Sequence, residues 1–262
     1  MKNIRLNNRV ELILSALPPI FLLILWESAV RLEYLKPLFF PPPSMIFKTL
    51  IEMTDSGELQ SNVYASLARI FWGFILGTIP GIVLGLIMGW SERARTVLDP
   101  VVSAMYSIPK IAIFPLFLLI FGIGELSKIV LIAIGCFFLV LINSMTGVRN
   151  INKTYFEVAD NYGAGKVKTF TRIILPASLP MVFSGVRLAL GGSLLMVVAA
   201  EFIAANNGIG AMIWYAWETL ETEKIYVGIL ICGLLGLLFT SVLKKIEKIF
   251  IPWEEATQNE IE

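Results

Sequence analysis

The chain has 262 residues, of which 56% are apolar and 16% are charged, and its mean hydropathy is +0.77. Soluble globular domains do not have this composition, so the chain is predicted to be an integral membrane protein. The formal net charge is +1 and the sequence contains no histidine. These values give no sign of nucleic-acid binding, and they remove the commonest metal ligand and general base.

Several stretches are apolar over the length needed to cross a bilayer, about 20 residues. We identify six of them, at roughly 11–31, 67–89, 101–121, 129–148, 181–203 and 225–243. The predicted fold class is therefore all-α, with six transmembrane helices. Residues 1–60 would hold the first helix and an external connector, 61–246 the main transmembrane domain, and 247–262 a C-terminal tail. Cys136 and Cys232 lie inside apolar stretches and are assigned no role.

Basic residues concentrate in alternate connections, which the positive-inside rule assigns to the cytoplasm. The long connection at 149–180 is rich in Lys and Arg, and Lys244, Lys245 and Lys248 follow the sixth stretch, whereas the connection before that stretch carries Glu218, Glu221 and Glu223. Both termini and the 149–180 connection are therefore expected to be cytoplasmic.

Glycine and proline mark the second and third stretches. The second stretch has glycine at every fourth position: Gly73, Gly77, Gly81, Gly85 and Gly89. This spacing predicts a smooth helix face for close packing against another helix. In the third stretch, Pro109 and Pro115 interrupt backbone hydrogen bonding, so this helix is expected to be irregular.

One long polar segment, 157–176, interrupts the apolar pattern. Thr154 and Glu157 have the spacing of a capping box, which predicts a helix that starts at Tyr155. An apolar stripe would follow on one face of that helix, formed by Tyr155, Val158, Ala159 and Tyr162. Gly163 stands where a left-handed residue would end the helix.

A second helical piece is predicted over 166–174, ending before Pro176, with the next membrane helix beginning at Pro180. The segment would then be two short helices bent at a glycine. Such a pattern fits either a loop that lies on the bilayer surface or an element that docks onto a partner protein.

The spacing of Glu157-x-Ala159, Gly163 and Ile173-x-Leu175-Pro176 resembles the cytoplasmic EAA loop of permease subunits of bacterial ATP-binding-cassette importers. Val158 stands where that family usually has alanine. Similarity to the nitrate, sulfonate and taurine branch of the family extends from about Leu35 to Pro252. It includes segments 40–43, 65–69, 98–100, 121–125, 127–128, 185–187 and 199–201.

The resemblance implies a type I importer transmembrane domain in the bacterial inner membrane, which forms the substrate pathway by alternating access. It implies three partners: two copies of an ATPase subunit, a second permease copy or a sister permease, and an extracytoplasmic solute-binding protein. The loop at 150–178 would insert into a groove of the ATPase. Its docking residues would be Thr154, Glu157, Ala159, Gly163, Ile173, Leu175 and Pro176.

These docking residues would differ in role. Glu157 would cap the helix and pair with a basic residue of the ATPase, Ala159 would keep the contact close, and Gly163 would supply the turn. The sequence has no Gly-x-x-x-x-Gly-Lys-Ser/Thr phosphate loop. The chain is therefore expected to be a non-catalytic subunit without a cofactor, with ATP and magnesium on the partner ATPase.

Three ionisable residues inside the membrane stretches are candidates for the pathway: Lys110, Arg187 and Glu201. For Lys110 and Arg187, the partner would be either a transient anionic substrate or a permanent group, such as a carboxylate or a carbonyl at a proline break. Glu201 would line the external mouth or cap the fifth helix.

Members of this branch carry small anions such as sulfonates, taurine, nitrate and bicarbonate, and others carry aromatic carboxylates or thiamin-precursor pyrimidines. Many sulfonate, taurine and nitrate permeases have Pro-Pro where this chain has Pro109-Lys110. A secondary transporter would instead be expected to have an internal repeat and mid-membrane carboxylates. A membrane enzyme would need histidines or paired aspartates near one membrane face.

Overall fold

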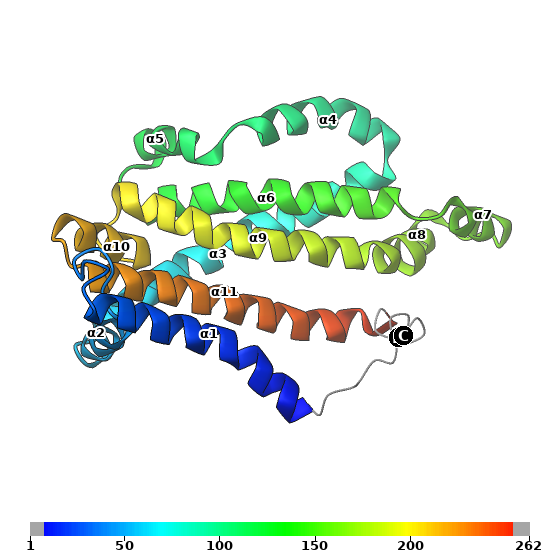
Figure 1. Ribbon diagram of the computed structural model, residues 1–262. Helices are drawn as coiled ribbons and strands as arrows, with labels where there is room; N and C mark the ends of the chain where they lie inside the picture. Colours follow the sequence, from blue (N-terminus) through cyan, green and yellow to red (C-terminus); the bar gives the residue numbers. More distant parts are fainter. Residues whose placement is uncertain (1–7, 254–262) are drawn as a thin grey trace. The chain divides into compact units, whose positions relative to one another are not determined.

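The computed structural model describes residues 8–253, and the side chains from Leu17 onward. Every regular element in this part of the chain is helical, which confirms the all-α class. The expected locations of the two termini, and most of the predicted tail at 247–262, lie outside the described residues. In chain order the helices are α1 (Asn8–Arg31), α2 (Pro43–Asp55), α3 (Glu58–Trp90), α4 (Glu92–Ser107), α5 (Lys110–Phe121), α6 (Glu125–Arg149), α7 (Lys153–Asn161), α8 (Lys166–Thr169), α9 (Leu175–Ala204), α10 (Ile209–Glu218) and α11 (Thr222–Phe250) (Figure 1).

Within the described residues, four helical segments are long and apolar enough to cross a membrane. They are Glu58–Trp90, Glu125–Arg149, Lys166–Ala204 and Thr222–Phe250. Helices α4 and α5 pass the same test when they are taken together, but the chain bends by 94° between them. If they are counted as one broken span, the number of candidate spans rises to five. The first predicted stretch forms the 24-residue helix α1, which is outside this set. The count of six spans therefore stays a prediction.

The break between α4 and α5 follows from Pro109. Ile108 is extended (φ −73°, ψ 128°), as expected for a residue that precedes proline, and Pro109 is extended as well (ψ 116°). The third predicted stretch is therefore irregular, as the sequence indicated. At its other end, α4 begins after Ser91, whose side chain accepts a hydrogen bond from the Ala94 backbone N–H at 3.2 Å.

The chain divides into two compact units. The described part of the first unit runs to Ser61 and adds Met212–Leu230, and the second unit holds Asn62–Ala211 and the residues from Ile231 onward. In the first unit, Glu27 accepts a hydrogen bond from Arg31 Nε at 2.7 Å, and Ser44 Oγ donates to the same carboxylate at 2.8 Å.

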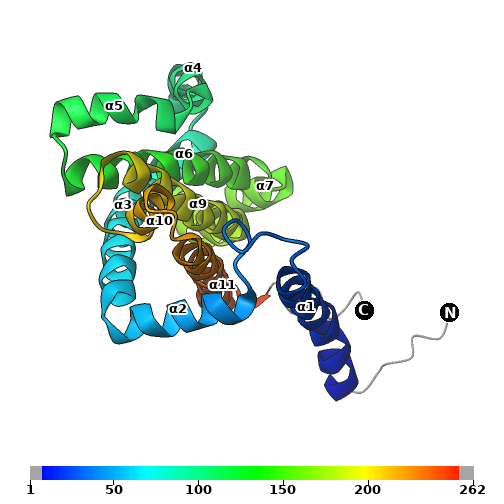
Figure 2. The ribbon, with the colours of Figure 1, turned by 60° about the vertical axis from the view of Figure 1, so that its left-hand side comes forward.

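The second unit is built on the pair α6 and α9, which lie side by side in both ribbon views (Figures 1 and 2). Buried apolar residues of both helices and of α3 form its main core, including Ile132, Val140 and Val186. Side chains of the segment that follows α6 pack against the same core. The polar segment predicted at 157–176 is thus attached to the packed interior of this unit.

Helix α3 lies against α6 along the glycine stripe. A Cβ atom at Gly81 would lie 2.7 Å from the Phe137 carbonyl oxygen, and one at Gly85 would lie 2.5 Å from that of Leu141. Such a separation is too short for any side chain, so the two backbones approach closely only because these positions are glycine. The predicted packing role of the stripe is confirmed.

Candidate functional site

Helix α7 begins two residues earlier than the capping-box pattern predicted. Asn152, and not Thr154, is the N-cap: the Asn152 side-chain oxygen accepts hydrogen bonds from the backbone N–H of Thr154 at 3.0 Å and from its hydroxyl at 2.9 Å. The predicted capping box of Thr154 and Glu157 was therefore wrong. An asparagine just upstream already supplies an acceptor to the free N–H groups of the first turn.

The other end of α7 is closed by Gly163, as predicted. Its φ is +66°, in the left-handed region. The Gly163 N–H donates to the Asp160 carbonyl at 3.0 Å, and the Ala164 N–H donates to the Ala159 carbonyl at 2.8 Å. This pair of hydrogen bonds is the Schellman motif, which satisfies the last carbonyls of the helix. Helix α7 is thus a short rod with both ends capped.

The two sides of α7 have different surroundings. Tyr155, Val158 and Tyr162 are exposed, and Tyr162 retains 87% of its accessible surface. Ala159 is only 4% exposed, and Phe156 packs against the core of the second unit. The predicted apolar stripe is therefore split: three of its members face outward, whereas Ala159 lies on the inner side, against the chain itself.

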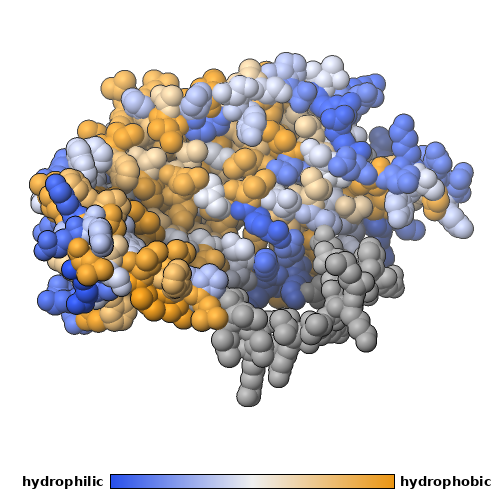
Figure 3. Space-filling model, viewed as in Figure 1, coloured by the Kyte–Doolittle hydropathy of each residue, from blue (hydrophilic) through white to orange (hydrophobic). Residues whose placement is uncertain are grey.

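Hydrophilic residues surround this exposed face (Figure 3). Lys153, Glu157 and Asp160 on α7 are exposed. The outward apolar side chains are therefore bordered by charges of both signs. An exposed apolar patch with a charged rim is typical of a protein-binding surface.

The second half of the loop differs from the prediction at Pro176. Helix α8 passes through a π-helical turn, Phe170–Ile174, directly into α9, so that Lys166–Ala204 forms one continuous helical segment of 39 residues. Proline normally ends a helix because its ring collides with the carbonyl four residues before it. The wider π turn, in which the Leu175 N–H donates to the Phe170 carbonyl, relieves this conflict.

Residues Ile173 and Leu175 are partly buried against the core of the second unit, beside the fully buried Ile174. They anchor the start of the long helix. Of the predicted docking residues, only Thr154, Glu157 and Gly163 are exposed.

Lys110 lies at the break between α4 and α5. Its Nζ donates to the carbonyl oxygens of Met105, Tyr106 and Ile108 at 2.7–2.8 Å. It also lies over the ring of Phe138, at 4.9 Å from the ring centre. Lys110 thus satisfies carbonyls that the proline break leaves without a helical partner.

Arg187 is paired with Glu247 of α11 through its Nη2. The Arg187 side chain is 44% exposed, and it borders a small cavity of 40 Å³ with Gly191 and Thr240. Its partner in this structure is therefore a carboxylate of the chain itself, which agrees with one of the two alternatives that the sequence left open for this residue.

Glu201 is the acceptor at the centre of a buried ionic network, with a side chain that is fully buried. Its carboxylate accepts hydrogen bonds from Arg69 Nη1 at 2.6 Å and from Ser66 Oγ at 2.8 Å. The backbone N–H of Gly210 donates to it at 2.8 Å. The residue therefore joins α9 to α3 and to the start of α10.

Arg69 completes this network, which we call the Arg69 cluster (Asn62, Ser66, Arg69, Glu125, Lys128, Glu201, Asn207 and the backbone at 208–210). Arg69 is 2% exposed, and its Nε and Nη2 donate to the Glu125 carboxylate at 2.6 and 2.8 Å. Its remaining N–H groups bond to Glu201 and to the main-chain and side-chain oxygens of Asn207. All five guanidinium donors are thus used.

Gly208 shows how closely this cluster is packed. Its φ is +116°, and a Cβ at this position would overlap the Glu201 carboxylate and lie 2.6 Å from Arg69 Nη1. The Gly208 N–H donates to Asn62 Oδ1 at 2.8 Å.

Glu201 was among the candidates predicted from the sequence, whereas Arg69 and Glu125 were not. The signal was present, because Ser66, Arg69, Glu125 and Glu201 each lie in a segment that carries the family resemblance. What the sequence lacked was any sign that these separate segments meet.

Comparisons with known proteins agree with this architecture. A solved structure titled "Inward facing conformations of the MetNI methionine ABC transporter" superposes with a TM-score of 0.60 at 16% sequence identity, covering 72% of this chain and 95% of that chain. At this identity the similarity shows the fold alone.

The family of this chain is shown by sequence similarity. The family "Binding-protein-dependent transport system inner membrane component" matches residues 81–254, and the chain belongs to it. A Bacillus subtilis (strain 168) protein named "Putative aliphatic sulfonates transport permease protein SsuC" is 35% identical over 91% of this chain and 86% of its own length. The "Taurine transport system permease protein TauC" of Escherichia coli (strain K12) is 32% identical over 90% and 88%. The "Formylaminopyrimidine transport permease protein ThiX" of Halalkalibacterium halodurans is 30% identical over 90% and 94%.

The Arg69 cluster gives a prediction for stability. Arg69→Met or Glu201→Met alone should each lower the free energy of unfolding by about 3–5 kcal/mol, because each removes an ionic partner from the buried charge that is left. The double variant removes both charges and should be less destabilised than the sum of the two single variants. The measurement is a double-mutant cycle on the purified protein in detergent.

The control is the exposed pair Lys48 and Glu52, whose side chains are 77% and 62% exposed. The same cycle there should give a coupling of no more than about 1 kcal/mol. Additive losses at Arg69 and Glu201 would contradict the view that the two charges depend on each other.

Proposed function

We propose that this chain forms the translocation pathway of an ATP-driven importer by alternating access, and that the loop at 150–178 couples it to separate ATPase subunits. The observation that carries this proposal is the geometry of α7: a short helix, capped at both ends, with an outward apolar face and an inner face packed on the core. Membership of the family supports the same role.

The packing of the loop supports a mechanical coupling. ATP binding can shift a permease between inward-open and outward-open states only through a contact that differs between those states. A force on Tyr155, Val158 and Tyr162 would pass through Phe156 and Ala159 into the core. The continuous segment Lys166–Ala204 would carry it along the length of the unit.

The partners follow from this mechanism. An ATPase pair related by two-fold symmetry offers two equivalent grooves, so we propose two copies of this chain with two ATPase subunits. ATP and magnesium would bind to the ATPase, and an extracytoplasmic solute-binding protein would deliver the substrate. Native mass spectrometry of the purified complex counts the permease copies, and a single copy would exclude this arrangement.

The pathway candidates are proposed with different roles. Lys110 and Glu201 both form hydrogen bonds with groups of the chain itself. Lys110 would shape the pathway through the α4–α5 break, and Glu201 would shape it through the Arg69 cluster. Arg187 is half-exposed next to a small cavity, and it is the candidate that could meet an anion directly if its bond to Glu247 opened.

If the loop at 150–178 couples the permease to the ATPase, Gly163→Val should uncouple them. A side chain in the left-handed region costs about 1–2 kcal/mol, and more when it is β-branched, so the turn after α7 should be lost. Substrate-stimulated ATP hydrolysis and transport by the reconstituted complex should fall to the basal level while the chain still inserts into the membrane.

The matched control is Gly165→Val, two residues further on. Gly165 has φ −67° and open space around its Cβ position, so valine fits there. Normal transport by Gly163→Val, or equal losses in both variants, would contradict the coupling proposal.

For the substrate we propose a small sulfonate-like anion, because the relatives named for aliphatic sulfonates and taurine are 35% and 32% identical to this chain. A formylaminopyrimidine is the second candidate, from a relative 30% identical. Nitrate, bicarbonate and aromatic carboxylates are further alternatives within the same family. The melting temperature of the cognate solute-binding protein should rise with taurine or an alkanesulfonate and not with a formylaminopyrimidine. The opposite result would exclude the sulfonate assignment.

A further inference from the structure

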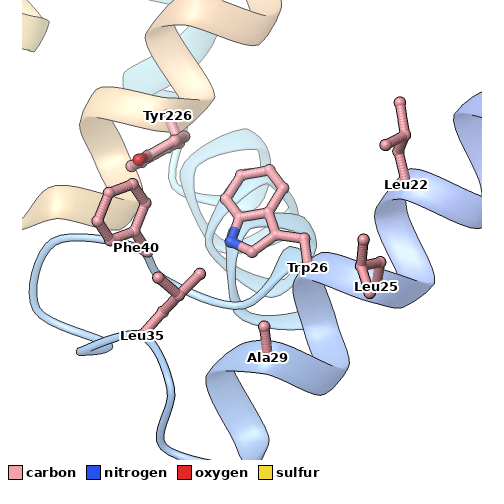
Figure 4. A pocket seen from close by; sticks show the side chains of 7 residues that line it. All are labelled: Leu22, Leu25, Trp26, Ala29, Leu35, Phe40 and Tyr226. Carbon is pink, nitrogen blue, oxygen red and sulfur yellow. The ribbon is translucent and has the colours of Figure 1, made fainter.

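A groove with a volume of 490 Å³ lies within the first unit, between α1, the connector after it and the start of α11 (Figure 4). Trp26 and Ala29 are part of the α1 wall, and Leu35, Phe40 and Tyr226 form the opposite wall. Apart from the two amphipathic aromatic residues, every residue that lines the groove is apolar. The site thus suits a hydrocarbon ligand.

One polar atom in the groove lacks a partner. Trp26 Nε1 is shielded from solvent and has no hydrogen-bond acceptor among the described residues. Figure 4 shows this nitrogen on the side of the indole that faces Leu35 and Phe40. The nearby Tyr226 hydroxyl donates instead to the Phe39 carbonyl at 3.1 Å. A buried N–H without an acceptor is costly, so an acceptor that enters the groove and moves the shielding side chains aside would be stabilising.

The surroundings of α1 indicate what that acceptor is. Consecutive residues from Ile20 to Leu25 are all exposed, so apolar side chains surround the whole circumference of the helix. Such a surface is stable in hydrocarbon. The Glu27–Arg31 ion pair begins directly after Trp26 and forms the polar end of α1, where the Arg31 side chain is 69% exposed. Trp26 therefore lies at the boundary between acyl chains and headgroups, where tryptophan is enriched in membrane proteins.

At this depth the acceptors that a bilayer offers are the ester carbonyls of its glycerophospholipids. We propose that the groove binds one acyl chain of a glycerophospholipid, with an ester carbonyl oxygen accepting a hydrogen bond from Trp26 Nε1 and the headgroup on the side of Arg31. The lipid would fill the groove between α1 and the connector. It is a structural ligand of the first unit, independent of the transported substrate.

The test compares two lipids on the purified permease in detergent: dioleoylphosphatidylglycerol and its diether analogue, which lacks the ester carbonyls. Native mass spectrometry measures the fraction of chains that retain lipid. The wild type should retain the diester several-fold more than the diether. Trp26→Phe, which keeps an aromatic ring but removes the N–H, should abolish this preference, and Ala29→Phe should fill the groove and displace both lipids.

Trp72→Phe is the matched control, since the same change is made on a ring that is 54% exposed on α3. It should leave the preference unchanged. Equal retention of the two lipids by the wild type, or undiminished retention by Ala29→Phe, would overturn the proposal. If Ala29→Phe instead dissociates a permease dimer and leaves lipid retention unchanged, the groove belongs to a second copy of the chain.

Discussion

The burial of the Arg69 guanidinium constrains one end of the second unit more than any other interaction. A guanidinium that is 2% exposed has almost no contact with water, so each of its donors must find an acceptor within the protein. Arg69 meets this requirement by donating hydrogen bonds to Glu125, Glu201 and Asn207. The ends of α3, α6 and α9 and the turn before α10 are fixed by one side chain. The glycine stripe of α3 adds to this arrangement, because it lets α3 approach α6 closely along its length.

The opposite end of the same unit carries the capped helix α7. The segment Lys166–Ala204 connects the two ends, since it begins in the loop and contains Glu201 close to its last turn. The π turn at Phe170–Ile174 is what makes this connection continuous across Pro176. A movement at α7 and a rearrangement near the Arg69 cluster would therefore be linked through a single helix and its packing on α6.

Local sequence rules predicted the features that local interactions decide. The left-handed turn at Gly163, the close packing of the glycine stripe and the irregular third stretch are all present. The errors arose where a second local interaction competed: Asn152 supplies the cap in place of Thr154, and a π turn lets the helix pass Pro176. The Arg69 cluster could not be predicted, because the partners of the guanidinium, Glu125, Glu201 and Asn207, are 56 to 138 residues apart from Arg69 and meet it only when the helices pack.

The proposed coupling requires the outward face of α7 to contact the ATPase subunit. It is tested most directly by placing a photo-crosslinking amino acid at Tyr162, which is 87% exposed, in the assembled complex. Ile123, which is 83% exposed at the other end of α6, serves as the reference position. We expect a crosslink from Tyr162 to the ATPase and none from Ile123. An intact complex in which Tyr162 gives no ATPase crosslink, or in which Ile123 does, would contradict it.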